Sequence, residues 1–426
     1  MLSETLINYI KEGKLDDKLI DIYQGKESLD KQKMRYIDGI HQFKELFPND
    51  DDLSIFSAPG RTEVGGNHTD HQHGQVLAAA INQDAIAIAA KNDSNVVNIK
   101  SEGYDMITIS LDDISKKAEE QGTTLALIKG VFAGCKNRGY QIGGVDAYVT
   151  SDVLGGSGLS SSAAFETLID SIISGLFNDM KIDAVTIAII GQYAENYYFG
   201  KPCGLMDQMA CSVGSLCHID FAESEPKIEK IDFDLDSAGY SLCITDTKGS
   251  HADLTADYAA VPKEMKSVAE FFEKEYLIEV SKEDVLSNIP MLREKLGDRA
   301  VLRALHFYGE NTRVEKESEA LINSNVNEFL KYVLVSGDSS YKLLQNIYTT
   351  HDVEHQNMSI ALCISQMILG ENNGVCRVHG GGFAGTIQAF VKNEKVSEYK
   401  SALDNVFGEG SCAILKIRKY GGIRVV

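Results

Sequence analysis

Residues 144–177 read GVDAYVTSDVLGGSGLSSSAAFETLIDSIISGLF, in which a strand-like segment leads through a loop of glycine and serine into a helix. The helix is indicated by apolar residues three or four positions apart, at Phe165, Leu168, Ile169, Ile172, Ile173 and Leu176. Glycines let backbone N–H groups approach an anion, serine hydroxyls add donors, and the following helix directs its positive end at the same place. We therefore predict a phosphate-binding loop at GGSGLSSSA, residues 155–163.

This loop differs from two well-known phosphate-binding motifs, because neither the GxxxxGK sequence of a Walker A loop nor the GxGxxG of a dinucleotide fold occurs there. The alternative interpretation is a flexible linker of glycine and serine. Linkers do not normally lie between a strand and a strongly periodic helix, so the phosphate loop is favoured.

Before this loop, several short segments alternate between apolar and polar residues. They are LSIFSAP (53–59), VLAAAI (76–81), DAIAIAA (84–90), NVVNIKS (95–101) and MITISL (106–111). Such segments in succession predict an antiparallel or mixed sheet. Residues 1 to about 50 instead have apolar residues at helical spacing, which predicts two or three helices.

The C-terminal half follows an acidic, irregular stretch at 222–239. It is helical from about 253 to 370, after which VCRVHGGGFAGTIQAFV (375–391) predicts a hairpin and AILKIRK (413–419) a last strand. Helices on one face of an antiparallel sheet describe an α+β domain. We predict an α+β fold of two domains, with mixed and antiparallel sheets and the active site in the cleft between them. The predicted parts are a helical extension at 1–50, an N-terminal domain at 51–235 and a C-terminal α+β domain at 236–426.

Composition narrows the possible functions. Of the 426 residues, 43% are hydrophobic and 24% charged, which is typical of a soluble globular protein. The formal net charge of -21 disfavours binding to nucleic acid or to a membrane surface, so any phosphate site must gather positive potential locally. Eight cysteines are scattered without a CxxC pair, and no signal-like start or run of 18 apolar residues occurs. We therefore expect reduced thiols, a cytoplasmic location and no obligate protein partner.

A second segment, SAPGRTEVGGNHTDHQHG (57–74), packs many hydrogen-bonding side chains into a turn-rich stretch between two strands. They are Arg61, Asn67, His68, Asp70, His71 and His73. So many donors and acceptors in one loop suit a ligand with several hydroxyl groups. The alternatives are a solvated loop, or a metal site formed by His68, Asp70, His71 and His73.

A third segment, KPCGLMDQMACSVGS (201–215), has Asp207 as its sole carboxylate, and Pro202 and Gly204 place it in the first turn of a short helix. The alternative interpretation of Asp207 is a helix cap. Glu195, near the end of a helix predicted at 184–198, is a second candidate carboxylate, with a solvent-facing glutamate as its alternative.

Together, PGRTEVGGNHTDHQHG, GSGLSSSA, PCGLMDQ and HGGGFAG, in this order and spacing, resemble the kinase family of galactokinase, homoserine kinase, mevalonate kinase and phosphomevalonate kinase. The match is greatest to the galactokinase signature GRxNxIGEHTDY, for which this chain has GRTEVGGNHTDH, and to the galactokinase segment CGIMDQ, for which it has CGLMDQ. The resemblance extends from about Ser57 to Val391.

The resemblance implies a kinase that moves the γ-phosphate of ATP, with Mg²⁺, to the anomeric hydroxyl of galactose. Asp207 would lie beside that hydroxyl, and Arg61 would balance negative charge near Asp207 and the γ-phosphate. The implied ATP-binding residues are Gly156, Ser157, Gly158, Leu159, Ser160, Ser161 and Ser162, and the implied Mg²⁺ ligands are Ser162 and Glu195. The implied sugar-binding residues are Asn67, His68, Thr69, Asp70, Gly204 and Tyr258. Phosphoryl transfer mainly requires alignment and charge neutralisation, which these groups supply.

The chain departs from the family pattern at several positions. Asn67 replaces a glutamate expected to contact the hydroxyl at C6 of the sugar, which leaves open a galactose modified at C6, such as galacturonate. Further departures are His71 for tyrosine, His379 for threonine and Ala384 for glycine. None of these three removes an expected catalytic group.

Two other interpretations remain. A kinase for a small alcohol such as homoserine or mevalonate is disfavoured by the HTD cluster and by the aspartate of MDQ. A catalytically silent sensor of galactose and ATP that acts through a protein partner is disfavoured because Arg61, Ser162, Glu195 and Asp207 are all present.

Overall fold

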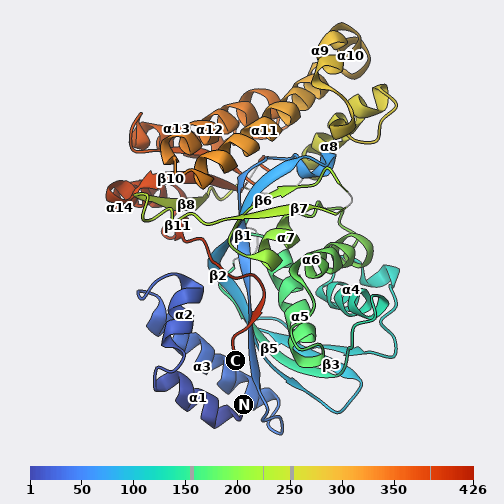
Figure 1. The fold of residues 1–426 in the computed structure, drawn as a ribbon, viewed down its shortest axis with the longest axis vertical. Helices are drawn as coiled ribbons and strands as arrows, with labels where there is room; N and C mark the ends of the chain where they lie inside the picture. Colours follow the sequence, from blue (N-terminus) through green and yellow to red (C-terminus); the bar gives the residue numbers. More distant parts are fainter. Residues whose placement is uncertain (154–157, 224, 250–253, 384) are drawn as a thin grey trace.

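The computed structural model describes residues 1–153, 158–223, 225–249, 254–383 and 385–426, and two β-sheets organise this part of the chain (Figure 1). The larger sheet has the strand order β12-β1-β2-β5-β3-β4, with β6 paired to the first part of β2 and β7 paired to β6. Its pairs are antiparallel except for β3 with β5, so the sheet is mixed. The strands are β1 (Ser54–Gly65), β2 (Gln75–Lys91), β3 (Val96–Ser101), β4 (Ile107–Ser110), β5 (Val145–Ser151), β6 (Leu216–Asp220), β7 (Lys227–Ile231) and β12 (Ile423–Arg424).

The smaller sheet is antiparallel and has the order β11-β8-β10-β9. Its strands are β8 (Tyr240–Asp246), β9 (Gly374–His379), β10 (Thr386–Lys392) and β11 (Cys412–Leu415). Helices α11 to α13 lie over it at the top of Figure 1, while α9 and α10 project to one side. The helices of this part are α8 (Thr255–Phe271), α9 (Lys282–Ser287), α10 (Ile289–Leu296), α11 (Asp298–Ile322), α12 (Val326–Ser339), α13 (Asn357–Leu369) and α14 (Val396–Phe407).

Strand β1 is buried along its whole length because both faces of the larger sheet are covered. Phe56 lies in an apolar core with residues of α4, α5 and α6, whereas Ile55, which points to the opposite face, lies in a core with the N-terminal helices. The helices on the first face are α4 (Thr124–Asn137), α5 (Ser161–Phe177), α6 (Ala184–Tyr193) with its π-helical continuation Ala194–Phe199, and α7 (Met206–Val213). Those on the second face are α1 (Ser3–Lys11), α2 (Asp16–Tyr23) and α3 (Leu29–Leu46).

The N-terminal helices are attached to the sheet by apolar packing and by a buried charge. Tyr36, Ile40 and Phe43 of α3 are fully buried, and burial of side chains of this size contributes about 1.5 to 3 kcal/mol each. Asp84 of β2 accepts hydrogen bonds from Arg35 of α3 at 2.7 Å and from Tyr23 of α2 at 2.9 Å. The predicted helical extension therefore packs as part of the sheet's second layer.

The predicted fold class is confirmed: the sheets are mixed and antiparallel, with helices packed on them. The predicted hairpin is confirmed as β9 and β10, although Ala384 in its turn lies outside the described residues. The division into three parts stays a prediction. Strand β12, from the end of the chain, pairs with β1 of the larger sheet, so the C-terminal segment contributes to both sheets.

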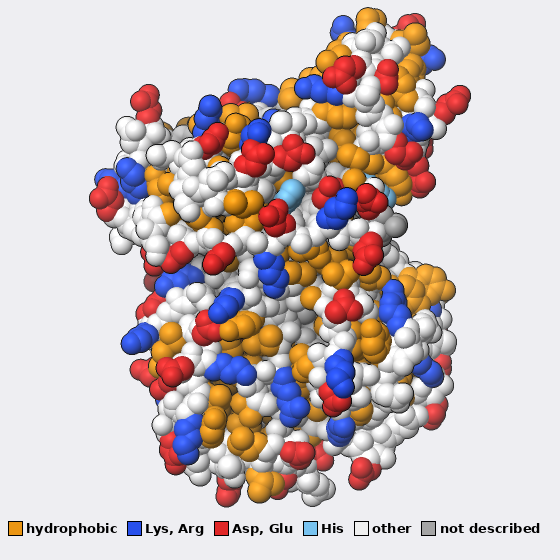
Figure 2. Space-filling view, in the orientation of Figure 1, with side chains coloured by type: hydrophobic (Ala, Val, Ile, Leu, Met, Phe, Trp, Pro, Cys, Tyr) orange, Lys and Arg blue, Asp and Glu red, His pale blue; other side chains and the backbone are white. Residues whose placement is uncertain are grey.

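The face in Figure 2 carries acidic and basic side chains intermixed. Across the described residues, no helix combines the length and apolar character needed to span a membrane.

Candidate active site

The centre of the site is an ion pair between Arg61 and Asp207, which come from two different segments singled out in the sequence. The ladder between β1 and β2 shifts register between Pro59 and Arg61, since proline has no N–H to donate, and the Arg61 N–H instead donates to Leu159 O at 3.1 Å. Arg61 then donates from Nε to Asp207 Oδ1 at 2.7 Å and from Nη2 to Oδ2 at 2.9 Å. Ser160 Oγ also donates to Asp207 Oδ2. Asp207 lies in the first turn of α7, as predicted.

The surroundings of Asp207 keep it ionised. Burial alone raises the pKa of a carboxyl group, but the charge and the hydrogen bonds of Arg61 outweigh it, and the pKa of Asp207 is lowered. Ser160 and the charge of Lys201 act in the same direction. The carboxylate therefore accepts hydrogen bonds rather than holding a proton, and its bonds go to Arg61 and Ser160 rather than to a helix cap.

The described part of the predicted phosphate loop turns sharply into α5. Gly158 and Ser160 have positive φ angles of 72° and 55°, and α5 begins at Ser161 with no acidic residue in its first turn. Strand β1 approaches this loop so closely that a Cβ on Gly60 would lie 2.8 Å from Leu159 O. These features suit an anion at the α5 N-terminus. Gly156 and Ser157 of the prediction lie outside the described residues.

Glu195 and Ser162 lie together beside this loop. Ser162 Oγ is 3.4 Å from Glu195 Oε1, and the Glu195 side chain is 5% exposed, so it is not the solvent-facing glutamate of the alternative. Gln208 donates to Glu195 Oε2 at 2.8 Å, and Lys201 Nζ lies 2.9 Å from Oε1. Burial is the main cause, and the charge of Glu195 the second, of a pKa of the neighbouring Glu166 that lies well above its ordinary value. Glu166 is thus neutral.

These groups fit a magnesium ion. Mg²⁺ prefers hard oxygen ligands and is usually held by one or two carboxylates together with substrate phosphates. Ser162 and Glu195 provide a hydroxyl and a carboxylate oxygen of this kind beside the phosphate loop. Within the described ranges, no group of three or more His, Cys, Asp and Glu residues is placed to hold a metal ion, so the alternative of a metal site at His68, Asp70, His71 and His73 is not supported.

The other predicted loop, residues 67–70, meets the turn between β9 and β10. His68, with a positive φ of 60°, places Nε2 3.0 Å from Gly381 O, and Tyr258 donates to Gly382 O at 2.8 Å. Burial and the charge of His71 lower the pKa of His68 to about 3, so its ring is neutral. Asp70 lies against Gly204, so closely that a Cβ added to Gly204 would clash with Asp70 Oδ2.

The side chain of Asn67 is turned into the protein, where its amide is fully hydrogen-bonded. Its Nδ2 donates to Glu63 Oε1 at 3.0 Å and to Gly380 O at 2.7 Å, while its Oδ1 accepts from Asn346 Nδ2 at 2.9 Å and from Ser340 Oγ at 3.3 Å. Thr69 is likewise buried and donates to Gly66 O at 2.9 Å. Of the predicted sugar-binding residues, His68 and Tyr258 both reach the turn between β9 and β10, and Asp70 lies against Gly204. The polar atoms of Asn67 and Thr69 are buried among their protein partners.

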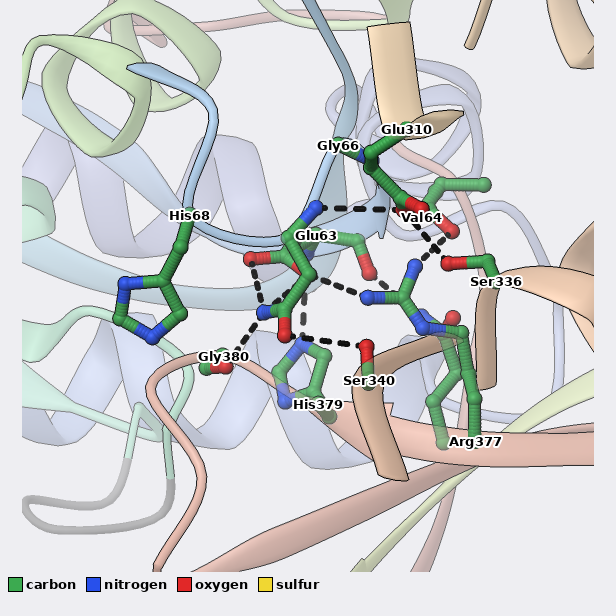
Figure 3. A network of polar contacts seen from close by, with 12 residues as sticks. Glu63, Val64, Gly66, His68, Glu310, Ser336, Ser340, Arg377, His379 and Gly380 are labelled. Atoms are coloured by element: carbon green, nitrogen blue, oxygen red, sulfur yellow. Dashed lines mark hydrogen bonds and ion pairs between the residues drawn. The ribbon is translucent and has the colours of Figure 1, made fainter. Parts of the chain in front are cut away.

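A buried charge network lies behind this loop, and sequence reasoning missed it (Figure 3). Arg377 of β9 donates to Glu63 Oε1 at 2.5 Å and to Val64 O at 2.8 Å, and His379 Nε2 accepts from the Glu63 N–H at 3.2 Å. In Figure 3 the His68 ring points away from these residues. A signal was present, because Glu63 stands where the galactokinase signature has asparagine, while Asn67 stands where it has glutamate. The carboxylate and the amide have thus exchanged places between two residues in contact.

An ionised aspartate held by arginine, beside a turn of glycine and serine at the N-terminus of a helix, fits the site of a small-molecule kinase. Two family models match the chain: the galactokinase galactose-binding signature at residues 41–91 and the N-terminal domain of GHMP kinases at residues 126–215. Galactokinase from Glaesserella parasuis is 30% identical over 366 residues, covering 85% of this chain and 91% of the relative. Galactokinase from Clostridium tetani is 29% identical over 367 residues, covering 83% and 88%.

Solved structures agree in fold. Lactococcus lactis galactokinase complexed with galactose superposes with a TM-score of 0.76 at 23% identity, covering 90% of this chain and 97% of that chain. Methanococcus jannaschii mevalonate kinase has a TM-score of 0.60 at 16% identity, covering 85% and 98%. The fold is therefore that of the GHMP kinases. Within this class, the chain belongs to the galactokinase family.

Proposed function

We propose that the protein transfers the γ-phosphate of ATP to the anomeric hydroxyl of galactose, giving galactose 1-phosphate and ADP. The observation that supports this most directly is the pair of Arg61 and Asp207, which is hydrogen-bonded to Gly158 and Ser160 of the predicted phosphate loop. Gly204, three residues before Asp207, lies against Asp70 of the loop at 67–70. Membership of the galactokinase family supports the choice of substrates. We infer that the reaction takes place in the cytoplasm, with small molecules as its only obligate partners.

In this proposal Asp207 and Arg61 act on the two reacting ends. The ionised Asp207 accepts a hydrogen bond from the sugar hydroxyl, which orients the oxygen toward the γ-phosphorus and gives its proton a path away. The hydroxyl oxygen forms a bond to that phosphorus as the bond to the ADP oxygen breaks. Arg61 holds Asp207 in its ionised form and reduces the repulsion between the carboxylate and the phosphate.

The nucleotide and its metal ion are assigned to the residues around α5. The backbone of residues 156–162 would surround the phosphates, with the α5 N-terminus directed at them. Ser162 and Glu195 would hold Mg²⁺, which when bound neutralises charge on the phosphates. His68, Asp70, Gly204 and Tyr258 would contact the sugar. Asn67 and Thr69 would support the sugar loop from behind, since their polar atoms bond to the protein.

The proposal is tested by a coupled assay of ADP release with Mg-ATP and a panel of sugars. The panel contains galactose, galacturonate, N-acetylgalactosamine, 2-deoxygalactose, glucose and arabinose. We expect galactose to give the highest kcat/KM. If the protein binds galactose and ATP but releases no ADP with any sugar, the proposed activity is wrong and a silent sensor takes its place. A preference for galacturonate would instead move the substrate to a sugar acid.

A further inference from the structure

Lys201 is held over Glu195 by the way the chain reverses at the end of the π-helix Ala194–Phe199. Gly200 has a positive φ of 88°, and the N–H groups of Gly200 and Lys201 both donate to Glu195 O, at 2.9 and 3.1 Å. Asn196 Oδ1 accepts from the Cys203 N–H at 2.7 Å, which ties the next residues to the same helix. As a result Lys201 Nζ lies 2.9 Å from Glu195 Oε1.

The two side chains of this ion pair differ in exposure and in the number of their hydrogen-bond partners. The Glu195 carboxylate is 5% exposed and also accepts hydrogen bonds from Ser162 and Gln208, so its position is fixed. The Lys201 side chain is 62% exposed, and in the described part of the chain its ammonium has this carboxylate as its hydrogen-bond partner. An ammonium has three donors, so two remain for a ligand.

Arg61, the other cation at the site, has less to offer a phosphate. Its Nε and Nη2 donate to Asp207, its Nη1 donates to Gly158 O, and its side chain is 7% exposed. Most of its donors are therefore committed to the protein. Compared with Arg61, Lys201 has more donors left for a ligand and a more exposed side chain, and its charge acts on Asp207 as well as on Glu195.

We propose that Lys201 is a further catalytic residue, whose ammonium contacts the γ-phosphate of ATP and stabilises the negative charge of the phosphoryl group during transfer. This inference rests on the proposed function. In the free protein Lys201 neutralises Glu195. If Glu195 held a divalent cation, its carboxylate would be shared between that cation and Lys201, and the Lys201 ammonium would donate to phosphate oxygens of a bound nucleotide instead. Charge-assisted hydrogen bonds of this kind are about twice as strong as neutral ones.

A purely structural role for Lys201 predicts a different pattern. If the lysine only holds Glu195 in place, its removal disturbs the binding of ADP and of ATP equally. If it contacts the γ-phosphate, its removal weakens only ligands that carry that phosphate. Nucleotide binding without turnover therefore separates the two roles.

The test compares wild type with Lys201→Met, Lys201→Arg and, as a matched control, Lys181→Met, since Lys181 is an exposed lysine paired with Asp179 on the surface. Isothermal titration measures the binding of Mg-ADP and of a non-hydrolysable Mg-ATP analogue, and the ADP-release assay measures kcat with galactose. For Lys201→Met we expect binding of the analogue to weaken about tenfold, with ADP affinity within about twofold of wild type. We expect kcat to fall at least about tenfold, with most of it kept in Lys201→Arg and all of it in Lys181→Met.

Equal losses for ADP and the analogue, or a Lys201→Met enzyme with wild-type kcat, would overturn the assignment. Failure of the proposed function is distinguishable, because wild type would then release no ADP with galactose. Lys201→Arg keeps the charge, so it reports on the role of the ammonium even if the methionine variant is unstable.

Discussion

Arg61 and Asp207 are joined by two parallel hydrogen bonds, from Nε to Oδ1 at 2.7 Å and from Nη2 to Oδ2 at 2.9 Å. This two-pronged geometry fixes the plane of the carboxylate as well as its charge. The bulge at Pro59 and the first turn of α7 bring the two residues together, and Ser160 joins the pair to the phosphate loop. A change at Arg61, Asp207 or Ser160 should therefore affect the alignment of the sugar and of the nucleotide together.

Replacing Asp207 by asparagine tests its contact with the sugar hydroxyl. The amide has no negative charge to draw the hydroxyl proton, so we expect kcat to fall at least about a hundredfold in the ADP-release assay. Asp179→Asn is the control, because Asp179 is 85% exposed and, among the described residues, pairs with Lys181 on the surface, and it should keep kcat within about twofold. Wild-type kcat in Asp207→Asn would rule out a catalytic role for this carboxylate.

Local signals in the sequence were sufficient for the short helix that carries Asp207 and for the β9–β10 hairpin, because glycine placement and hydrophobic period act over a few residues. They were insufficient for β1, which was predicted only as far as Pro59 but continues through the bulge to Gly65. The pair of Glu63 and Arg377 joins residues 314 positions apart, and only burial specifies such a contact. Likewise, no local pattern indicated that β12 pairs with β1.

The contact between Glu63 and Asn67 predicts that the two positions are energetically coupled. Glu63→Asn alone leaves the buried Arg377 without its carboxylate partner, so we expect a loss of about 3 to 5 kcal/mol in the free energy of unfolding. Asn67→Glu alone places two carboxylates in contact and should also destabilise the protein. The double variant keeps one carboxylate and one amide, so its loss should be at least about 1 kcal/mol smaller than the sum of the single losses in urea unfolding. Additive losses would show that the two side chains act independently.

From the raised pKa of Glu63 we also predict that the stability of the protein depends on pH. Burial raises the pKa of Glu63 from an ordinary value of 4.5 to about 7, although the charges of Arg377 and Arg61 oppose it and those of Glu310 and Asp70 add to it. The folded protein thus binds this proton more tightly than the unfolded chain does. The resulting stabilisation is fully present below pH 4.5 and is lost as pH rises through about 7.

We therefore expect the free energy of unfolding of wild type to fall, relative to that of Glu63→Gln, by about 3 kcal/mol between pH 4.5 and 8. Glutamine stays neutral throughout this range, so the difference between the two proteins isolates Glu63 from other titrating groups. Chemical unfolding at a series of pH values measures it. Parallel curves for the two proteins would contradict the raised pKa.

From the contact between Arg35 and Asp84 we predict that the N-terminal helices are required for a stable sheet beside the active site. Its Nη1 donates to Asp84 Oδ1 at 2.7 Å, and its Nη2 donates to the carbonyl oxygens of Asp84 and Thr150 at 2.8 and 3.1 Å. Asp84 is fully buried and pairs in register with Pro59, at the bulge that directs Arg61. Arg35→Met leaves this carboxylate with Arg418 as its charged partner at 3.0 Å, so we expect a loss of about 3 kcal/mol in the free energy of unfolding.

The matched control is Lys31→Met on the same helix. Lys31 is 69% exposed and reaches Asp152 at 3.4 Å, so its loss should cost less than about 1 kcal/mol. Urea unfolding of both variants provides the comparison, and equal small effects would mean that the buried charge does not anchor the helices. If Arg35→Met is destabilised as expected, its kcat with galactose should also fall, because the ladder that positions Arg61 shares the Asp84 and Pro59 pairing. A destabilised variant with wild-type kcat would limit the role of Arg35 to stability.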